Sequence, residues 1–411
     1  MMGCFFSFFY ILKIAPPIGE LRKETLIVNK VISTKEFRTR QEFVKKENPK
    51  GKEFIIGLDA GYSSMKVFFE NGYFCFPSYA KQIDEHNLLN ITNEKDILYK
   101  DEITGEVYMI GTTAQNMVDS TDTNDTDGEL FSRKRYNNKK FKILCNVAIG
   151  IATMDKKDNR PIVIQTGLPS SYVDGDSMAL KKSLSREMKF SLKVGSKTWK
   201  TFDLIIDPDN IFIVPQPTGA LYSVLIDETG KFTHNAKHYL ESNVLVMDIG
   251  FGTFDFYGIK NRAVVCKETI DEYGMREVLQ QTSDEIRKEL CEDIRVAALQ
   301  QNLETGTVTC INEEEMISES KPFGEYLERS SEKIFLEAFE RAKSVTNTFR
   351  DYKYLIVTGG TAAAWGEKIN KYFSRMSTLG IIQGNVNDNL SLIYSNVRGY
   401  YLMRVMFNNK H

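Results

Sequence analysis

Two segments of the chain repeat one pattern, and this repeat constrains the fold more than any other feature. Residues 57–69 read GLDAGYSSMKVFF, and residues 246–259 read VMDIGFGTFDFYGI. Each runs from an apolar stretch through Asp-x-Gly, an aromatic residue and a small polar turn into a second apolar stretch. The leading runs, Phe54–Leu58 and Val244–Met247, are short and mostly aliphatic, as buried strands are. The sequence therefore predicts two similar β-hairpins far apart in the chain.

The turns of these hairpins have the composition of anion-binding loops. Gly61 in the first turn, and Gly250 with Gly252 in the second, free the backbone dihedral angles and let a ligand approach the main chain closely. Successive N–H groups in such a turn form a concave anion site. A single match is more often an ordinary hairpin turn, but the pair favours a duplicated phosphate clamp.

The acidic residue that opens each turn indicates a cation. Asp59 and Asp248 would repel a bare phosphate, so we expect a metal ion or a water molecule between each carboxylate and the phosphate. Mg²⁺ prefers oxygen ligands, keeps much of its hydration shell and is commonly shared between carboxylates and nucleotide phosphates. Lys66 follows Asp59 on the returning strand, from which its ammonium group can reach the same phosphates.

Length and charge limit the other possibilities. The 411 residues suffice for two domains, and 42% hydrophobic with 26% charged residues is typical of a soluble globular protein. A net charge of −2 gives no general attraction for nucleic acid. The six cysteines contain no C-x-x-C motif and are predicted to be reduced thiols in a cytosolic chain. One basic cluster has a single aromatic neighbour and is interpreted as a solvated helix face; it consists of Arg133, Lys134, Arg135, Lys139, Lys140 and Lys142.

The first fifty residues differ from the rest. Cys4–Leu12 is apolar but too short to span a membrane, and it lacks the positive n-region of a signal peptide. Pro16 and Pro17 end any helix there, and residues 18–52 are rich in charge without a core pattern. Three alternatives follow, in order of preference: an over-called translation start, a flexible arm that docks on a neighbouring subunit, or a weak membrane anchor.

The region between the hairpins alternates strands and helices. A strand, a helix and a strand in that order imply a crossover connection and a partly parallel sheet. Gln216 lies at a strand-to-helix junction, and Gly359-Gly360 follows a buried strand, where a flat ring can lie against the backbone. The predicted helices are 141–153, 217–225, 275–300, 323–347 and 400–407, and the predicted strands are 73–79, 107–111, 161–166, 211–214 and 354–357.

These parts, in this order, resemble the actin, Hsp70 and sugar-kinase ATPase superfamily over about residues 52–407. Within it, Gly167-Leu168-Pro169 and Asn396-Val397-Arg398-Gly399 are most similar to bacterial plasmid-segregation actins of the ParM (StbA) type. The resemblance implies an α/β, ribonuclease H-like fold of two domains with a nucleotide cleft between them. It implies an extension over 1–51, flexible or mis-called, a domain I over 52–243 with the helix in 396–411 packing back on it, and a domain II over 244–395.

The resemblance also assigns roles to residues. Asp59 and Asp248 would hold a hydrated Mg²⁺ from the two domains, and Gln216 would orient the attacking water, where ParM relatives have Glu and actin has Gln. Asp255 would either reach the outer shell of the metal or cap the turn. The implied cofactor is ATP or GTP with Mg²⁺. The implied nucleotide contacts are Gly61, Tyr62, Ser63, Ser64, Lys66, Gly250, Gly252, Thr253, Gly359, Gly360 and Thr361.

The function implied by this resemblance is a cytoplasmic, self-polymerising helical filament with slow, Mg²⁺-dependent NTP hydrolysis that controls filament turnover. Such a filament segregates plasmid DNA through a separate, ParR-like DNA-binding adaptor on a centromere-like site, so we expect neither direct nucleic-acid binding nor membrane association. Two alternatives share the fold. A sugar- or acetate-type kinase would need a further catalytic Asp in the cleft, for which the sequence offers no convincing candidate, and a membrane-associated, MreB-like cell-shape filament would use Phe5–Leu12. A nucleotide-binding regulator that does not polymerise is a third possibility.

Overall fold

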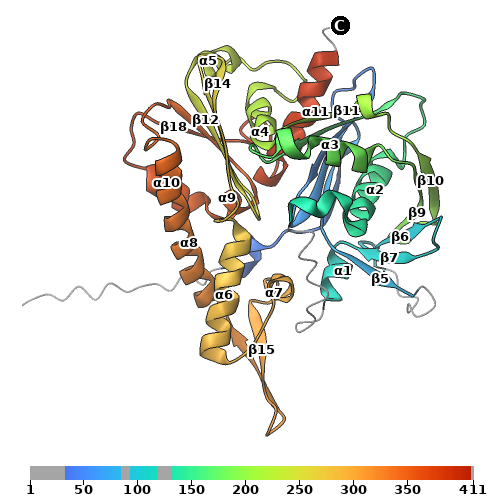
Figure 1. The fold of residues 1–411 in the computed structure, drawn as a ribbon, viewed down its shortest axis with the longest axis vertical. Helices are drawn as coiled ribbons and strands as arrows, with labels where there is room; N and C mark the ends of the chain where they lie inside the picture. Colours follow the sequence, from blue (N-terminus) through green and yellow to red (C-terminus); the bar gives the residue numbers. More distant parts are fainter. Residues whose placement is uncertain (1–32, 85–92, 119–131, 409–411) are drawn as a thin grey trace, which may run out of the picture. The chain divides into compact units, whose positions relative to one another are not determined.

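The computed structural model describes residues 33–84, 93–118 and 132–408. The first predicted hairpin lies in a six-stranded sheet, here called the first sheet (Figure 1). Its strands β1 to β4 are antiparallel, whereas β2, β8 and β11 are parallel. In spatial order the strands are β1 (Glu42–Lys45), β4 (Gly72–Pro77), β3 (Ser64–Phe69), β2 (Phe54–Ala60), β8 (Ile162–Leu168) and β11 (Ile211–Pro215).

The second hairpin lies in a five-stranded sheet of the same design, here called the second sheet. An antiparallel meander is again followed by parallel strands. In spatial order these are β14 (Ala263–Ile270), β13 (Phe254–Lys260), β12 (Val244–Ile249), β17 (Tyr354–Thr358) and β18 (Gly380–Gln383). The repeated sequence pattern thus corresponds to a repeated strand arrangement.

Two smaller antiparallel units extend from these sheets. One is a five-stranded sheet with the order β10 (Lys200–Leu204), β9 (Met188–Val194), β6 (Ile97–Asp101), β7 (Val107–Ile110) and β5 (Ala80–Ile83). The other is the hairpin of β15 (Thr307–Asn312) and β16 (Ile317–Pro322).

Two helices lie between the first and second sheets (Figure 1). They are α4 (Gln216–Leu225) and α11 (Ser395–Asn408), and they contact each other. Both central strands are buried on both faces: Ile55 of β2 and Val246 of β12 face these helices, while Ile56 and Met247 face separate outer cores. Because successive residues of a strand point to opposite sides, continuous apolar runs are what such strands require.

A close backbone contact joins the two central helices. A Cβ atom at Gly399 of α11 would lie 1.7 Å from the carbonyl oxygen of Gly219 in α4. No side chain fits there, so glycine at 399 lets the helices approach. This contact sets how closely α4 and α11 pack against each other between the two sheets.

Further helices cover the outer faces. On the first sheet these are α2 (Lys139–Thr153), capped by the Asn138 side chain, and α3 (Val173–Leu184). On the second sheet they are α6 (Met275–Leu290), α8 (Gly324–Val345) and α10 (Gly366–Phe373). The short helices are α1 (Thr112–Asn116), α5 (Ala236–Glu241), α7 (Val296–Asn302) and α9 (Gly360–Ala364), and the 3₁₀ helices are η1 (Thr34–Phe37), η3 (Arg133–Asn137), η4 (Pro208–Asn210) and η5 (Leu392–Tyr394).

Three expectations from the sequence need correction. The helix predicted over 275–300 is two helices, because Cys291 takes a left-handed φ of +60° that ends α6. Arg135, assigned to a solvated helix face, is buried. Residues 33–51, assigned to a flexible or mis-called extension, contain η1 and β1, and β1 pairs along its whole length with β4. Cys4–Leu12 lies outside the described residues. The domain boundary at 243/244 stays a prediction.

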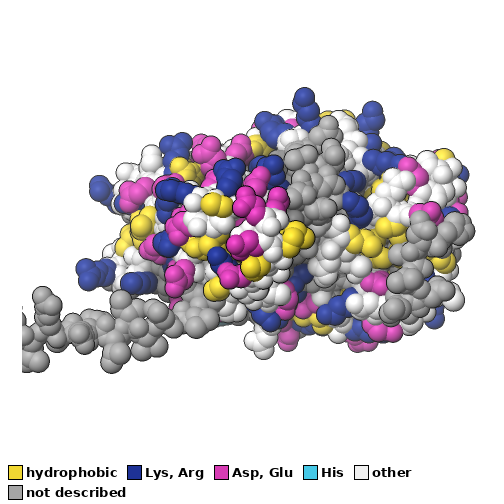
Figure 2. Space-filling view, turned by 90° about the horizontal axis from the view of Figure 1, so that it is seen from below, with side chains coloured by type: hydrophobic (Ala, Val, Ile, Leu, Met, Phe, Trp, Pro, Cys, Tyr) yellow, Lys and Arg dark blue, Asp and Glu magenta, His cyan; other side chains and the backbone are white. Residues whose placement is uncertain are grey.

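The mixed surface charge and the free cysteines of the described residues are those of an ordinary globular protein. Acidic and basic side chains are interspersed on the face shown in Figure 2, without a broad basic area. The five described cysteines, Cys75, Cys145, Cys266, Cys291 and Cys310, form no disulfide. Within residues 33–84, 93–118 and 132–408, every helix is too short or too polar to span a bilayer.

Candidate functional site

The two hairpins close with the same turn. The Gly61 N–H donates to the Ser64 carbonyl oxygen at 3.1 Å, and the Gly250 N–H donates to that of Thr253 at 2.8 Å. The cross-strand register also matches, because Asp59 lies opposite Lys66 and Asp248 opposite Asp255. The two hairpins are thus alike in conformation as well as in sequence. They differ in the residue opposite the acid, which is the basic Lys66 in the first hairpin and the acidic Asp255 in the second.

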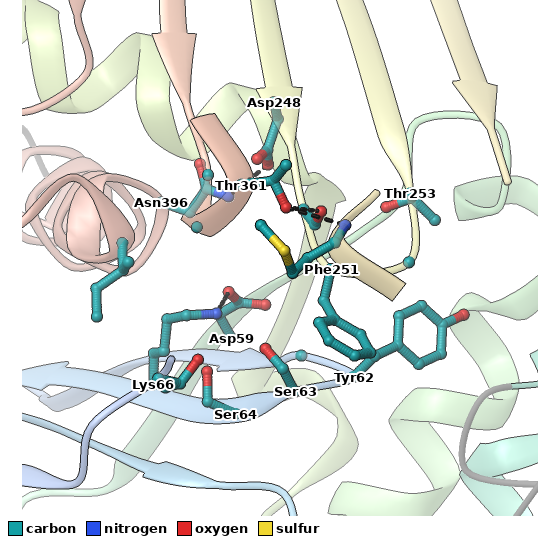
Figure 3. Close-up of a pocket in the computed structure, with 18 of the residues that line it drawn as sticks. Asp59, Tyr62, Ser63, Ser64, Lys66, Asp248, Phe251, Thr253, Thr361 and Asn396 are labelled. Carbon is teal, nitrogen blue, oxygen red and sulfur yellow. Dashed lines mark hydrogen bonds and ion pairs between the residues drawn. The ribbon is translucent and has the colours of Figure 1, made fainter. Parts of the chain in front are cut away.

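Both turns face one cavity of about 310 Å³ between the first and second sheets (Figure 3). The first hairpin approaches it from one side and the second from the other. All the nucleotide-site residues expected from the sequence line this cavity: Asp59, Gly61, Tyr62, Ser63, Ser64, Lys66, Gln216, Asp248, Gly250, Gly252, Thr253, Gly359, Gly360 and Thr361.

Asp59 is the centre of a polar group on the first hairpin. It is 5% exposed, and its Oδ2 accepts from Lys66 Nζ at 3.0 Å. Its Oδ1 accepts from Gln216 Nε2 at 3.1 Å. Because the ionised carboxylate only accepts, the nitrogen of the Gln216 amide must face Asp59. The side-chain Oε1 of Gln216 is therefore left to accept a hydrogen bond from another group.

Asp248 has a different environment on the second hairpin. It is also 5% exposed, and its Oδ2 accepts from Asn396 Nδ2 at 2.7 Å. Burial, and then the nearby charge of Asp255, raise the pKa of Asp248 to about 7. Among the described residues it forms no ion pair. A buried carboxyl group that lacks a cationic partner is suited to hold a cation.

Two buried side-chain oxygen atoms of the cavity also lack a hydrogen-bond partner among the described residues. They are Ser64 Oγ and Asn396 Oδ1. A Cβ atom at Gly252 would lie 2.9 Å from the Tyr62 ring, so this part of the second turn has no room for a side chain. Free oxygen atoms beside exposed backbone fit a hydrated Mg²⁺ and phosphate groups.

The Gly pair after β17 is held against the second turn. Gly359 has a φ of +104°, and its Cβ would lie 2.2 Å from the Ile249 carbonyl oxygen. The Thr361 hydroxyl donates to the Gly250 carbonyl oxygen at 2.6 Å and accepts from the Met275 N–H at 3.1 Å. Thr361 therefore lines the cavity while its hydroxyl fixes the second turn relative to α6.

Asp255 does not line the cavity. Its Oδ1 accepts from the Ser170 N–H at 2.7 Å and from Thr269 Oγ1 at 2.6 Å. Burial raises its pKa to about 6, although these hydrogen bonds oppose the shift. Ser170 follows β8 of the first sheet, so Asp255 connects the two sheets beside the cavity. Its Oδ2 has no hydrogen-bond partner among the described residues, and the choice between the two roles left open by the sequence stays a prediction.

Sequence reasoning missed several residues of the cavity. Asn396 was part of the segment similar to ParM-type proteins, but no pattern marked its contact with Asp248. The Arg135 guanidinium lies 4.3 Å from the centre of the Tyr62 ring and also donates to the Ala60 carbonyl oxygen. Because Arg135 stands in a run of basic residues, the sequence gave no indication that its side chain is buried. Phe251, Met275 and residues 36–40 also line the cavity.

The fold is that of actin-like proteins. Residues 57–219 match the family model described as the N-terminal domain of actin-like proteins. No curated protein matches the sequence. The resemblance to actin-like proteins drawn from the sequence, and the α/β fold that it implies, are confirmed.

Solved structures with this fold include ParM proteins and an archaeal actin homolog. A non-polymerisable quadruple mutant of pCBH ParM has a TM-score of 0.66 at 18% identity, covering 87% of this chain and 100% of the other. A 15-stranded ParM filament from Clostridium botulinum has a TM-score of 0.64 at 18% identity, covering 87% and 99%. The archaeal actin homolog Ta0583 in complex with ADP has a TM-score of 0.57 at 18% identity, covering 85% and 98%. At these identities the likeness establishes the fold.

Proposed function

We propose that this protein is a nucleotide-dependent, self-polymerising actin-like filament protein of the cytoplasm, with slow, Mg²⁺-dependent NTP hydrolysis. One observation carries the proposal: two equivalent Asp-Gly turns, from two sheets, face a single cavity with Asp59 and Asp248 buried at its wall. Self-polymerisation draws support from solved relatives of the same fold that are described as filaments. The nucleotide draws support from the relative described with ADP.

Different residues of the cavity would bind the metal ion, the phosphates, the nucleoside and the attacking water. Asp59 and Asp248 would hold a hydrated Mg²⁺, which supplies positive charge to the phosphate oxygens. Gly61 to Ser64 and Gly250 to Thr253 would bind phosphate through backbone N–H and hydroxyl groups, and Gly359-Gly360 would lie against the nucleoside. Gln216 would orient water through its side-chain Oε1, since its side-chain Nε2 donates to Asp59 at 3.1 Å. An amide positions water without taking its proton, which is consistent with slow hydrolysis.

Binding at this cavity couples to the arrangement of the sheets. A triphosphate that contacts both turns favours the arrangement in which they are close, and its hydrolysis weakens that preference. A surface complementary only in the closed arrangement would then bind a second copy head to tail, and such contacts extend without limit. We propose that the filament segregates plasmid DNA through a separate, ParR-like adaptor on a centromere-like site, in keeping with the net charge of −2.

Light scattering and phosphate release test this function together. Purified protein with Mg²⁺ and ATP, GTP or no nucleotide should scatter light only with nucleotide, and scattering should fall as phosphate appears. Asp248→Asn should abolish both signals. Gln216→Ala should polymerise but release phosphate at least about tenfold more slowly, as expected for loss of a water-positioning group. Phosphate release without polymer at any concentration would refute the filament and favour a kinase or regulator.

A plasmid-loss assay tests segregation separately. A plasmid that carries the gene and its flanking DNA should be retained, and the Asp248→Asn version should be lost at the rate of random partition. Equal retention of the two plasmids would contradict a role in segregation while leaving polymerisation intact.

A further inference from the structure

Residues 33–46, here called the strap, run between the second and first sheets along the cavity. They are the dark blue segment that reaches the first sheet from beside α6 in Figure 1. The sequence assigned this segment to a flexible or mis-called extension, and the proposed mechanism does not use it. Its contacts fasten it at two places.

The first attachment is to the turn after α7. Thr34 Oγ1 donates to the Leu303 carbonyl oxygen at 2.8 Å, and Leu303 belongs to the core of the second sheet. Glu304 accepts from Arg38 Nη1 at 3.1 Å and pairs with Lys35 Nζ at 3.2 Å. Glu304 and Lys35 are about half exposed, whereas the Arg38 side chain is 11% exposed, so water weakens the Lys35–Glu304 pair more than the Arg38–Glu304 pair.

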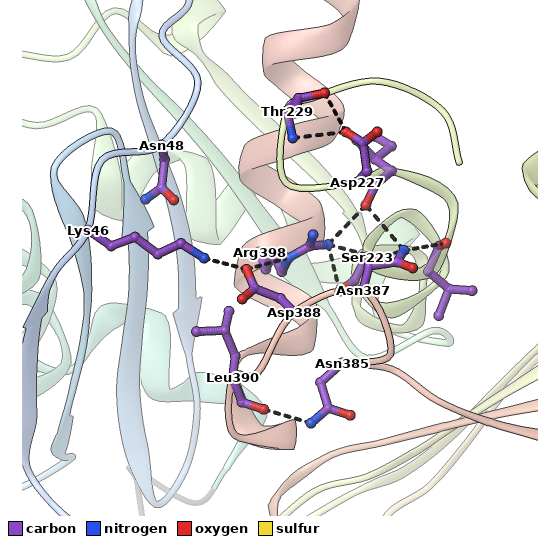
Figure 4. A network of polar contacts seen from close by, with 12 residues as sticks. Lys46, Asn48, Ser223, Asp227, Thr229, Asn385, Asn387, Asp388, Leu390 and Arg398 are labelled. Atoms are coloured by element: carbon purple, nitrogen blue, oxygen red, sulfur yellow. Dashed lines mark hydrogen bonds and ion pairs between the residues drawn. The ribbon is translucent and has the colours of Figure 1, made fainter. Parts of the chain in front are cut away.

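The second attachment is to the first sheet. The whole of β1 pairs with β4, and the Gln41 side chain donates to the Lys95 carbonyl oxygen and accepts from the Thr112 N–H. Figure 4 shows Lys46, directly after β1, reaching Asp388 at 2.6 Å. Asp388 also lies 3.5 Å from Nε of the buried Arg398 in α11. This attachment combines a strand pairing with part-buried polar contacts, so it is the stronger of the two.

The middle of the strap forms a wall of the cavity. Residues 36–40 line it, and η1 contacts α9, the helix that begins at the Gly pair. Phe37 is partly buried against the core of the second sheet. The same end of the cavity is lined by Ser391 and Ile393 beside α9. The strap therefore lies at the end of the cavity where the proposed function places the nucleoside.

The strap has little slack. Only Thr39 and Arg40 separate Arg38 at the first attachment from Gln41 at the second, and a chain spans at most about 3.5 Å per residue. A movement that separates the two sheets at this end by more than the slack of these few residues would therefore break one attachment. The weaker contacts, those of η1 with the turn after α7, are the ones expected to break.

We propose that the strap is a retaining element for the nucleotide: it closes the nucleoside end of the cavity, and η1 must leave the turn after α7 before the nucleotide can dissociate. The inference rests on the proposed nucleotide binding. It adds a step that controls nucleotide exchange, with Phe37 on the wall beside the nucleoside.

A reversible disulfide tests this step in the full-length protein. A Cβ at Gly306 would lie 3.9 Å from Thr34 Cβ, within the range of disulfides. The variant Thr34→Cys/Gly306→Cys, made with Cys291→Ser to remove an exposed thiol, is loaded while reduced with Mg²⁺ and an N-methylanthraniloyl derivative of ATP or GTP. After oxidation, release into excess unlabelled nucleotide should be at least about tenfold slower, as expected when an opening step is blocked. Reduction should restore the rate.

Matched controls separate the strap from other effects. Gly306→Cys alone carries the same left-handed strain, at a φ of +72°, but cannot cross-link, so its release rate should not respond to oxidation. Glu304→Gln removes both ion pairs of the first attachment from outside the cavity, and release should be about threefold faster. Glu314→Gln, exposed on the β15–β16 hairpin, should leave the rate unchanged.

The outcomes distinguish failure of the retaining role of the strap from failure of nucleotide binding. A disulfide that forms without slowing release refutes the retaining role, and failure of the disulfide to form refutes the attachment itself. An unchanged rate in Glu304→Gln argues against the strap even if the cysteine variant misfolds. Absence of nucleotide binding by the unsubstituted protein refutes the proposed function instead, and peptide mapping of the disulfide still reports on the attachment.

Discussion

Asp248→Asn should stabilise the nucleotide-free protein while abolishing its response to nucleotide. Asp248 is 5% exposed, and burial with the charge of Asp255 raises its pKa from the ordinary 3.8 to about 7. Each tenfold change in an ionisation constant corresponds to about 1.4 kcal/mol, so ionised Asp248 costs the folded state at most about 4 kcal/mol. Because Asp255 shares this repulsion, we expect about 2 kcal/mol for the single substitution. The new amide oxygen can still accept from Asn396.

The pH dependence has a definite sign. Between about pH 4 and pH 7 the folded protein holds a proton on Asp248 that the unfolded chain has lost. The stability of the unsubstituted protein therefore falls as the pH rises through this interval, whereas that of the variant falls less, because only the raised pKa of Asp255 remains. The advantage of Asp248→Asn should be near zero at pH 4 and largest at pH 8, at about 2–3 °C in thermal midpoint for a chain of this length.

The assay is thermal unfolding followed by fluorescence of the buried Trp365, with and without Mg²⁺ and nucleotide. Asp59→Asn is the matched control with the opposite sign. It leaves Lys66, whose side chain is 13% exposed, without its carboxylate, and should destabilise the protein by about 2 kcal/mol. A lower midpoint for Asp248→Asn at pH 8, or a difference independent of pH, would refute this account of the site.

Three further predictions follow from the same contacts. Gly399→Ala should lower stability by about 3 kcal/mol or more, seen as a drop in thermal midpoint, because its Cβ would lie 1.7 Å from the Gly219 carbonyl oxygen. Affinity for Mg²⁺ with nucleotide should rise from about pH 6 to about pH 8, with proton release measurable by calorimetry in two buffers, because Asp248 must ionise to hold a cation. Arg135→Lys should weaken nucleotide binding about fivefold in a fluorescence titration, because an ammonium group replaces the planar stack on Tyr62 in the first turn.

Simple substitutions serve as controls for these predictions. Gly366→Ala meets no atom within 4 Å and should leave the thermal midpoint unchanged. Lys134→Gln removes an exposed neighbour of Arg135 and should not alter nucleotide affinity. An affinity independent of pH over the stated interval would argue that Asp248 does not hold the cation.

The hairpins were predictable because their determinants are local. Asp, Gly and the apolar runs of each hairpin lie within about fourteen residues, and their spacing alone specifies a strand, a turn and a strand. The break at Cys291 was not predictable in this way, since no glycine or proline marks it.

Contacts between distant residues explain the remaining differences. Asn396 meets Asp248 across 148 positions of sequence, and Arg135 is buried because Tyr62 and Ala60 lie beneath it. The edge strand β1 is only four residues long and its sequence, Glu-Phe-Val-Lys, does not alternate between apolar and polar residues, so its pairing with β4 could not be predicted from pattern. Local periodicity therefore predicts which elements form, and packing decides which side chains complete the cavity.

The equivalent positions opposite Asp59 and Asp248 give the cavity a one-sided electric field. Lys66 balances Asp59 within the first hairpin, whereas Asp255 adds a second acid to the second hairpin. A duplicated backbone thus carries an asymmetric charge distribution. An incoming cation is drawn toward the second hairpin, and the anionic end of a ligand toward the first, so a ligand with both has only one favourable orientation in a nearly symmetric frame.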